Sequence, residues 1–115
     1  MRQTTIGVAL AAVAAATVLA GVAPAATRDN SLTATDGPGF TITMSKKTVK
    51  AGTYTIVVHD KSNIHNFRLI GPGVNKLTSV VFVGTKKWTV KLKKGTYKFV
   101  CDPHATTMKG VLRVT

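Results

Sequence analysis

The sequence predicts an all-β domain, an antiparallel β-sandwich of about seven short strands. From residue 40 onward, apolar and polar residues alternate with a period of two in successive short runs, the pattern of half-buried strands. Turn signals rich in Gly, Pro, Asn and Asp separate these runs. No window of residues 26–115 carries the apolar spacing of a helix, so short strands joined by turns favour a sandwich.

Each predicted strand is one of these short runs. The runs are Phe40–Met44, Tyr54–Val58, His65–Leu69, Val80–Val83, Trp88–Leu92, Tyr97–Cys101 and Val111–Val114. The same Gly-Thr-Tyr tripeptide precedes two of them, at Gly52 and Gly95, where glycine supplies the positive φ that a tight turn needs. We interpret this repeat as the same type of turn used twice, not as a domain repeat. The chain is long enough for a single domain.

Residues 1–25 have the layout of a secretory signal peptide. Arg2 gives a positive start, Ile6–Val22 is apolar and uncharged, and Ala23–Ala25 fits a small-residue cleavage site. A retained membrane anchor is the alternative, because the apolar run is close to the lower limit for a spanning helix. We expect cleavage near Ala25 and an exported protein, whether secreted, periplasmic or held in the cell envelope. Residues 26–39 lack periodicity and are expected to be a flexible lead-in to a domain at 40–115.

The chain is strongly basic, with a formal net charge of +12 and no glutamate. Its only acids are Asp29, Asp36, Asp60 and Asp102. Such a charge favours acidic partner proteins, anionic envelope polymers or membrane surfaces, and a solvated lysine surface without a partner is the plain alternative. Nucleic acid is not expected, because an exported chain rarely meets it and no Arg-rich helix or aromatic stacking motif is present.

The segment 97–110 gathers the residues with metal-binding chemistry. It holds the only cysteine, Cys101, followed by His104 and Met108. A thiolate, an imidazole and a thioether in one loop form a soft ligand set of the kind that copper prefers. Cys101 shares the strand parity of Tyr97 and Phe99, so we expect its sulfur to point into the sandwich. A lone cysteine forms no internal disulfide in an exported protein, and a bound metal would occupy it.

Two other histidines could complete the set. His65 begins a run whose next same-side residues, Phe67 and Leu69, are apolar, so it is expected at the rim of the core. It can reach the Cys101 loop if the two strand ends meet. His59 has the opposite parity to the apolar residues of its run, and we expect it on the surface or in a turn hydrogen bond.

The motif Cys101-Asp102-Pro103-His104 with Met108-Lys109-Gly110, together with the upstream pair His65-Asn66, resembles the copper loop of the cupredoxins, nearest to their plastocyanin-like branch. The resemblance covers about Phe40 to Thr115 and implies a Greek-key sandwich with one type 1 copper ion. It implies His65, Cys101 and His104 as strong ligands, Met108 as the weak axial ligand, and Asn66 as a hydrogen-bonding brace to the cysteine loop. The chain departs from the plastocyanin pattern in having one residue fewer between His104 and Met108.

The resemblance implies a one-electron carrier with an acidic redox partner, in which His104 is the exit for the electron. A copper carrier, buffer or delivery protein that meets a copper acceptor stays an alternative, as does a basic module that binds anionic envelope polymers. An enzyme is not expected, because a Cys–His nucleophile needs an orienting group and an oxyanion hole that the sequence does not offer. Zinc would gain nothing from the thioether. A monomer is expected, since an inward Cys101 cannot pair between chains.

Overall fold

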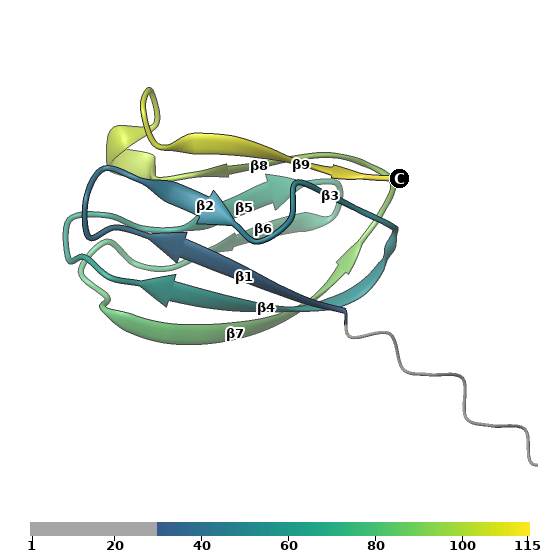
Figure 1. Ribbon diagram of the computed structural model, residues 1–115, viewed down its shortest axis with the longest axis horizontal. Coiled ribbons are helices and arrows are strands. Elements are labelled where there is room, and N and C mark those ends of the chain that lie inside the picture. Colours follow the sequence, from purple (N-terminus) through teal and green to yellow (C-terminus); the bar gives the residue numbers. More distant parts are fainter. Residues whose placement is uncertain (1–29) are drawn as a thin grey trace, which may run out of the picture.

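Alternating residues form two facing sheets in the part of the chain that the computed structural model describes, residues 30–115 (Figure 1). The strands are β1 Ser31–Asp36, β2 Ile42–Met44, β3 Thr48–Val49, β4 Gly52–Asp60, β5 Arg68–Gly71, β6 Val74–Leu77, β7 Gly84–Leu92, β8 Gly95–Val100 and β9 Lys109–Val114. One 3-10 turn, η1, spans Asp102–His104 between β8 and β9. The all-β prediction is confirmed, and the expected signal peptide at 1–25 lies outside the described residues.

The two sheets are mixed, whereas the sequence predicted antiparallel pairing. The first sheet has the order β2-β1-β4-β7 and the second the order β3-β9-β8-β5-β6. Strands β1 and β4 run parallel, as do β3 and β9, and the other pairs are antiparallel. The reason is the connection: the chain leaves the first sheet after β2 to form β3, and returns to lie beside β1 as β4. Strands joined by a crossover instead of a hairpin are free to run parallel.

The expectation of a flexible lead-in through residue 39 is wrong for Ser31–Asp36, which forms strand β1. Leu32 and Ala34 are fully buried and alternate with threonines, and the strand lies in register with β4 from Ser31 opposite Thr55 to Asp36 opposite Asp60. Alanine and threonine gave this run too little hydrophobic contrast for the pattern to be visible. The pairing with a long neighbouring strand supplies the hydrogen bonds that local propensity does not.

Other runs also differ from the predicted strands. In Phe40–Met44 only Ile42–Met44 is β2, and Phe40 is exposed. Val80–Val83 is a loop, and Val81 and Val83 are exposed. In the run His65–Leu69 only the part from Arg68 onward is β5, while His65, Asn66 and Phe67 form the buried segment that leads into it. A short apolar run cannot by itself be distinguished from an exposed apolar loop, because periodicity does not report burial.

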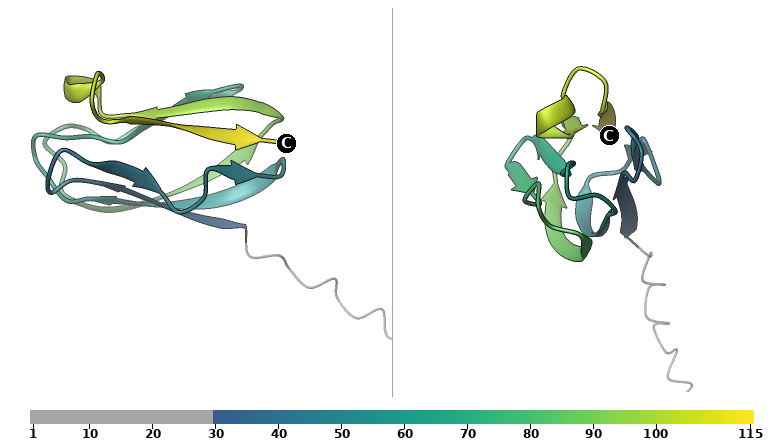
Figure 2. Two further views of the ribbon diagram at one scale, coloured as in Figure 1. Left: turned by 45° about the horizontal axis from the view of Figure 1, so that its top comes forward. Right: turned by 90° about the vertical axis from the view of Figure 1, so that its left-hand side faces the viewer.

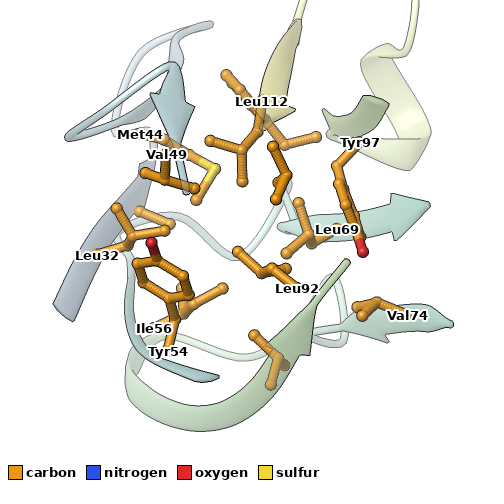
Figure 3. Close-up of a cluster of buried hydrophobic side chains, with 14 of the residues drawn as sticks. Leu32, Met44, Val49, Tyr54, Ile56, Leu69, Val74, Leu92, Tyr97 and Leu112 are labelled. Atoms are coloured by element: carbon orange, nitrogen blue, oxygen red, sulfur yellow. The ribbon is translucent and has the colours of Figure 1, made fainter. Parts of the chain in front are cut away.

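The core lies between the sheets and is filled by the inward residues of both, several of which are shown in Figure 3. Near the end of β8, the ring of Phe99 stacks on that of Phe67, with centroids 6.0 Å apart and planes 14° from parallel. A Cβ atom at Gly110 of β9 would overlap the Phe99 ring, so only glycine lets β9 pass so closely. Phe67 lies two residues after His65 and Phe99 two residues before Cys101, so this stacked pair adjoins both segments with metal-binding chemistry.

The loops gather at the two ends of the sandwich. The Cys101 end carries the connections at 37–41, 61–67, 78–83 and 101–108, and the basal end carries those at 45–51, 72–73 and 93–94 together with Thr115. Figure 1 shows η1 at the left and the C-terminus at the right, and the right-hand view of Figure 2 looks onto the Cys101 end. No helix among the described residues is both long and apolar enough to cross a membrane.

Candidate metal centre

Three side chains from two loops converge at the Cys101 end. His65 Nδ1 lies 3.0 Å from His104 Nδ1, and Cys101 Sγ lies 3.8 Å from the first and 3.5 Å from the second. The circle through these three atoms has a radius of about 2.0 Å, which matches a metal–nitrogen bond and is slightly short of a metal–sulfur bond. The three donors therefore surround a space of the size of one metal ion. The sequence prediction that His65 reaches the cysteine loop is confirmed.

The chemistry of the donors also fits a metal. Two imidazole nitrogens and one sulfur face each other at these distances, and their most direct common partner is a cation that accepts electron pairs from all three. A trigonal His₂Cys set with a thioether nearby is the arrangement that copper takes in electron-transfer sites. The residues present therefore fit a type 1 copper ion.

The loop that carries two of these residues is closed by its own backbone. Cys101 ends the strand in an extended conformation and Pro103 stands at the start of η1, where its missing N–H leaves no donor unsatisfied. The His104 amide donates to the Cys101 carbonyl at 3.1 Å, so the turn folds His104 back over the sulfur. The Met108 amide donates to the His104 carbonyl at 2.8 Å, and the Cys101 amide donates to the Met108 carbonyl at 3.0 Å.

Burial differs among the four predicted ligands. His65, Cys101 and Met108 are fully buried, whereas His104 is half-buried. The backbone bonds just described hold Met108 beside Cys101 at the edge of the same loop. Its place is therefore compatible with the axial role that the resemblance implies, and that role stays a prediction. His104 is the only one of these side chains that solvent reaches.

Asn66 joins the two loops with its backbone and its side chain. Its amide N–H points at Cys101 Sγ at 3.4 Å, its Oδ1 accepts from the Asp102 amide at 2.7 Å, and its Nδ2 donates to Asp102 Oδ2 at 2.8 Å. Nδ2 also donates to the Thr78 carbonyl at 3.2 Å. The side chain is almost fully buried, so these bonds are shielded from water. The bracing role that the resemblance implied for Asn66 agrees with this geometry.

A second layer of polar residues holds this brace, and the sequence analysis did not find it. Arg68 Nε donates to Asp102 Oδ1 at 2.8 Å, and its other nitrogens reach Asp102 Oδ2 and Asn75 Oδ1. The hydrogen bond from Arg68 lowers the pKa of the Asp102 carboxyl. The buried Thr78 hydroxyl accepts from the Phe67 amide at 2.9 Å and donates to Asp60 Oδ2 at 3.1 Å. Single polar residues in loops carry no sequence pattern, and only the fold shows their partners.

Phe40 covers the two histidines, which the sequence analysis also missed. Its ring centroid lies 5.1 Å from that of His65 and 5.0 Å from that of His104, both edge to face, and it is 63% exposed. His65 Nε2 is buried without a hydrogen-bond partner among the described residues, so packing orients this ring. Gly37 has a φ of +70°, and a Cβ there would lie only 3.0 Å from Ser62 Cβ and 3.4 Å from His65 Cδ2. Glycine thus lets the loop 37–41 approach closely enough to place Phe40.

His59 takes no part in the cluster of metal-binding side chains found among the described residues. It lies in β4, is half-buried, and its Nδ1 is 3.1 Å from Thr85 Oγ1. The place away from the core agrees with the parity argument, but the contact is a cross-strand one between β4 and β7 and not the expected turn hydrogen bond.

Comparison with known proteins identifies the family. The family model for copper-binding proteins of the plastocyanin/azurin family matches residues 28–115. No curated protein matches the chain.

Solved structures share the fold. Reduced rusticyanin has 23% identity and a TM-score of 0.56 over 74% of this chain and 78% of that chain. Reduced auracyanin from Roseiflexus castenholzii has 20% identity and a TM-score of 0.53, covering 75% of this chain and 97% of that one. Amicyanin from Paracoccus versutus has 15% identity and a TM-score of 0.50, covering 75% and 82%. At these identities the likeness concerns the fold.

Proposed function

Because the chain belongs to the plastocyanin/azurin family of copper-binding proteins, we propose that it is an exported one-electron carrier with a single type 1 copper ion. The observation that carries the proposal is the approach of His65 Nδ1, Cys101 Sγ and His104 Nδ1 to within 3.0–3.8 Å of one another at one end of the sandwich. His65, Cys101 and His104 are the strong ligands in this proposal. Bound copper supplies a couple between Cu(I) and Cu(II).

Met108 is the weak axial ligand in the same proposal. Its full burial and the two backbone bonds that link it to Cys101 and His104 support the assignment. A weak fourth ligand adjusts the reduction potential more than it adjusts the affinity. We therefore expect Met108→Leu to keep the visible absorption of a blue site and to raise its potential, because an oxidised ion loses a donor.

The protein contributes by holding the ligands in fixed positions. Asn66 fixes the spacing of the two loops, and Arg68 and Thr78 fix the groups that Asn66 binds. A ligand set that is held by buried hydrogen bonds cannot rearrange much when the charge at its centre changes by one. Small rearrangement makes electron exchange fast. This supports electron carriage over copper delivery, because delivery requires a ligand to dissociate from the ion.

The exit for the electron is the half-buried His104. Phe40 and Ile64, both exposed and apolar, lie at the same end, Phe40 against His104 and Ile64 next to His65 in the chain. A redox partner would therefore meet a face that is apolar around the histidine. The high net positive charge of the whole molecule would attract an acidic partner protein over a distance, while the contact around His104 itself would be apolar.

The test is the addition of Cu(II) to the purified protein. We expect an intense visible sulfur-to-copper charge-transfer band that is absent in Cys101→Ser, and voltammetry should then show reversible, fast exchange. A colourless protein would remove the copper site from the proposal. A coloured protein with slow exchange that passes Cu(I) to an apo-acceptor would replace electron carriage by delivery.

Export is the remaining part of the proposal, and the apolar segment Ile6–Val22 with the small residues that follow it supports it. Expression of the full sequence with its N-terminal segment should place the protein outside the cytoplasm, cleaved near Ala25. The N-terminal sequence of the recovered protein measures this directly, and a retained N-terminus would show the segment to be an anchor.

A further inference from the structure

Seven of the fourteen lysines and arginines among the described residues stand at the basal end. Exposed lysines and one arginine stand on the strand ends and turns there: Lys46, Lys47, Lys50, Lys91, Lys93, Lys94 and Arg113. The connections of the Cys101 end, by contrast, carry Lys61 as their only lysine and expose the apolar side chains Phe40, Ile64, Val81 and Val83. The other seven cations, which are Lys61, Arg68, Lys76, Lys86, Lys87, Lys98 and Lys109, lie outside the basal end. Because Asp36, Asp60 and Asp102 all lie at the Cys101 end, the basal end is the more basic of the two.

The topology is what collects these cations. The Arg113 amide donates to the Lys47 carbonyl at 2.8 Å, and β3 pairs with β9 so that Thr48 faces Arg113. Lys91 of β7 pairs with Thr53 of β4, close to where β4 begins. Lys93 and Lys94 form the turn from β7 to β8, whose ends reach the same side. Segments far apart in the sequence thus place their charges around one end (Figure 1).

No acidic group among the described residues neutralises this cluster. The acids at 36 and 60 are buried, and Asp102 is paired with Arg68, all three at the ends of strands or in the loop of the Cys101 end. Like charges on one surface raise the free energy of the isolated protein, and an opposite charge outside it relieves that cost. The basal end is therefore built to meet an anionic surface.

Two grooves flank the basal end and add concave, lysine-lined surface to it. One, of about 350 Å³, is lined by Lys46, Lys50, Asn30 and Tyr54 among others. The other, of about 380 Å³, lies between β6 and β7 and is lined by Lys76, Lys91 and Lys93 among others.

The chain enters the domain at this same end. Asn30 Nδ2 donates to the Thr53 carbonyl at 3.1 Å, at the start of β4. In the sequence, the residues before Asn30 include a further cation, Arg28, and the apolar stretch Ile6–Val22. A stretch of this composition enters a bilayer during export, and the end of the domain that follows it directly in the chain is the basal end.

We propose that the basal end is a docking surface for a bilayer containing anionic phospholipids. Bound in this way, the domain points the Cys101 end away from the membrane, so the surface that holds it and the surface that exchanges electrons lie at opposite ends. Basic clusters next to a membrane bind anionic lipid through the sum of many weak attractions, and salt screens them. The proposal rests on the export that is part of the proposed function, but it does not depend on copper, because it concerns the apoprotein and the copper protein equally.

The test is co-sedimentation of the exported protein with vesicles. One set contains about one third phosphatidylglycerol in phosphatidylcholine and the other phosphatidylcholine alone, at about 0.1 M and about 1 M salt, where the screening lengths are roughly 10 Å and 3 Å. A basal variant carries Lys46→Glu, Lys50→Glu and Lys93→Glu. A matched variant carries Lys61→Glu, Lys87→Glu and Lys98→Glu, exposed lysines outside the basal end, so both variants have the same net charge.

We expect binding to the anionic vesicles at low salt only, weakened about tenfold or more in the basal variant and much less in the matched variant. Thermal unfolding of both variants checks that they fold. Equal weakening of the two variants would overturn the proposal in favour of a diffuse charge effect. Equal binding to neutral vesicles would overturn the proposal, because anionic lipid would then not be what the protein recognises. Binding to soluble anionic polysaccharide with none to vesicles would overturn the proposed occupant.

Discussion

His65 Nδ1 and His104 Nδ1 lie 3.0 Å apart, although the two residues are 39 positions apart in the chain. Both imidazoles turn Nδ1 toward the centre, but His65 is fully buried whereas His104 is half-buried. This asymmetry means that one of them can be removed and replaced from solvent while the other cannot.

The first prediction uses this difference. His104→Gly should lose the visible copper band, and added imidazole should restore it, because the glycine leaves an opening to solvent beside Cys101. His65→Gly should lose the band and regain much less of it with imidazole, since its space is closed by Phe40 and the core. Absorption titrations measure both. Equal rescue of the two variants would contradict the geometry.

The second prediction concerns Asn66. Asn66→Ala removes hydrogen bonds to Asp102 and Thr78 and leaves the Asp102 amide without its acceptor. Loss of buried polar partners should lower the free energy of unfolding by about 2–4 kcal/mol and should slow electron exchange as the loops loosen. The matched variant is Asn75→Ala, which removes an exposed amide bound to Arg68 and should change both quantities little. Chemical denaturation and voltammetry give the two readouts.

The third prediction concerns Phe40, whose ring covers both histidines. Phe40→Ala should admit water to the rings and lower the reduction potential, because solvent favours the more highly charged oxidised site. Stability should change by less than about 1 kcal/mol, since the ring is mostly exposed. Val81→Ala, at the same end and 80% exposed, is the control and should leave the potential unchanged. A potential that falls equally in both variants would show that Phe40 has no special effect.

The fourth prediction is a pH dependence from Asp36. Burial, and then the neighbouring Asp60 carboxyl, raise the pKa of Asp36 from 3.8 to about 7, and neither oxygen has a hydrogen-bond partner among the described residues. The folded pKa is above the unfolded one, so the folded state holds the proton more tightly. Its contribution to stability is complete below pH 3.8 and is lost as pH rises through about 7.

Asp36→Asn should therefore stabilise the protein at pH 8 by a few kcal/mol relative to its effect at pH 4, as measured by the difference in unfolding free energy from the wild type. Asp102→Asn should show the opposite slope, because Arg68 lowers the pKa of Asp102 and its contribution is present above the unfolded value and lost in acid. A difference between wild type and Asp36→Asn that does not change with pH would show that Asp36 is not held neutral.

Much of the centre was predictable because its ligands sit on strong local patterns. The spacing of Cys101, His104 and Met108 is a property of one loop, and the parity of Cys101 with Tyr97 and Phe99 follows from the period of a strand. The inward direction of the Cys101 sulfur and the place of His59 away from the core follow from strand parity alone, without knowledge of the neighbouring strands. Strand β1 was missed because its contrast is weak until β4 lies beside it.

The sequence by itself determined which side chains could bind a metal, that they stand on a β scaffold, and that the chain carries a large positive charge. Only the tertiary structure decided that His65 and His104 meet, that Phe40 covers them, that Asn66 and Arg68 hold Asp102, and that half of the cations of the described residues stand at the end opposite the centre. The physical reason is that local periodicity records which face of a strand a residue takes. Which strand ends lie together depends on pairings between distant segments, and those are settled by the packing of the whole core.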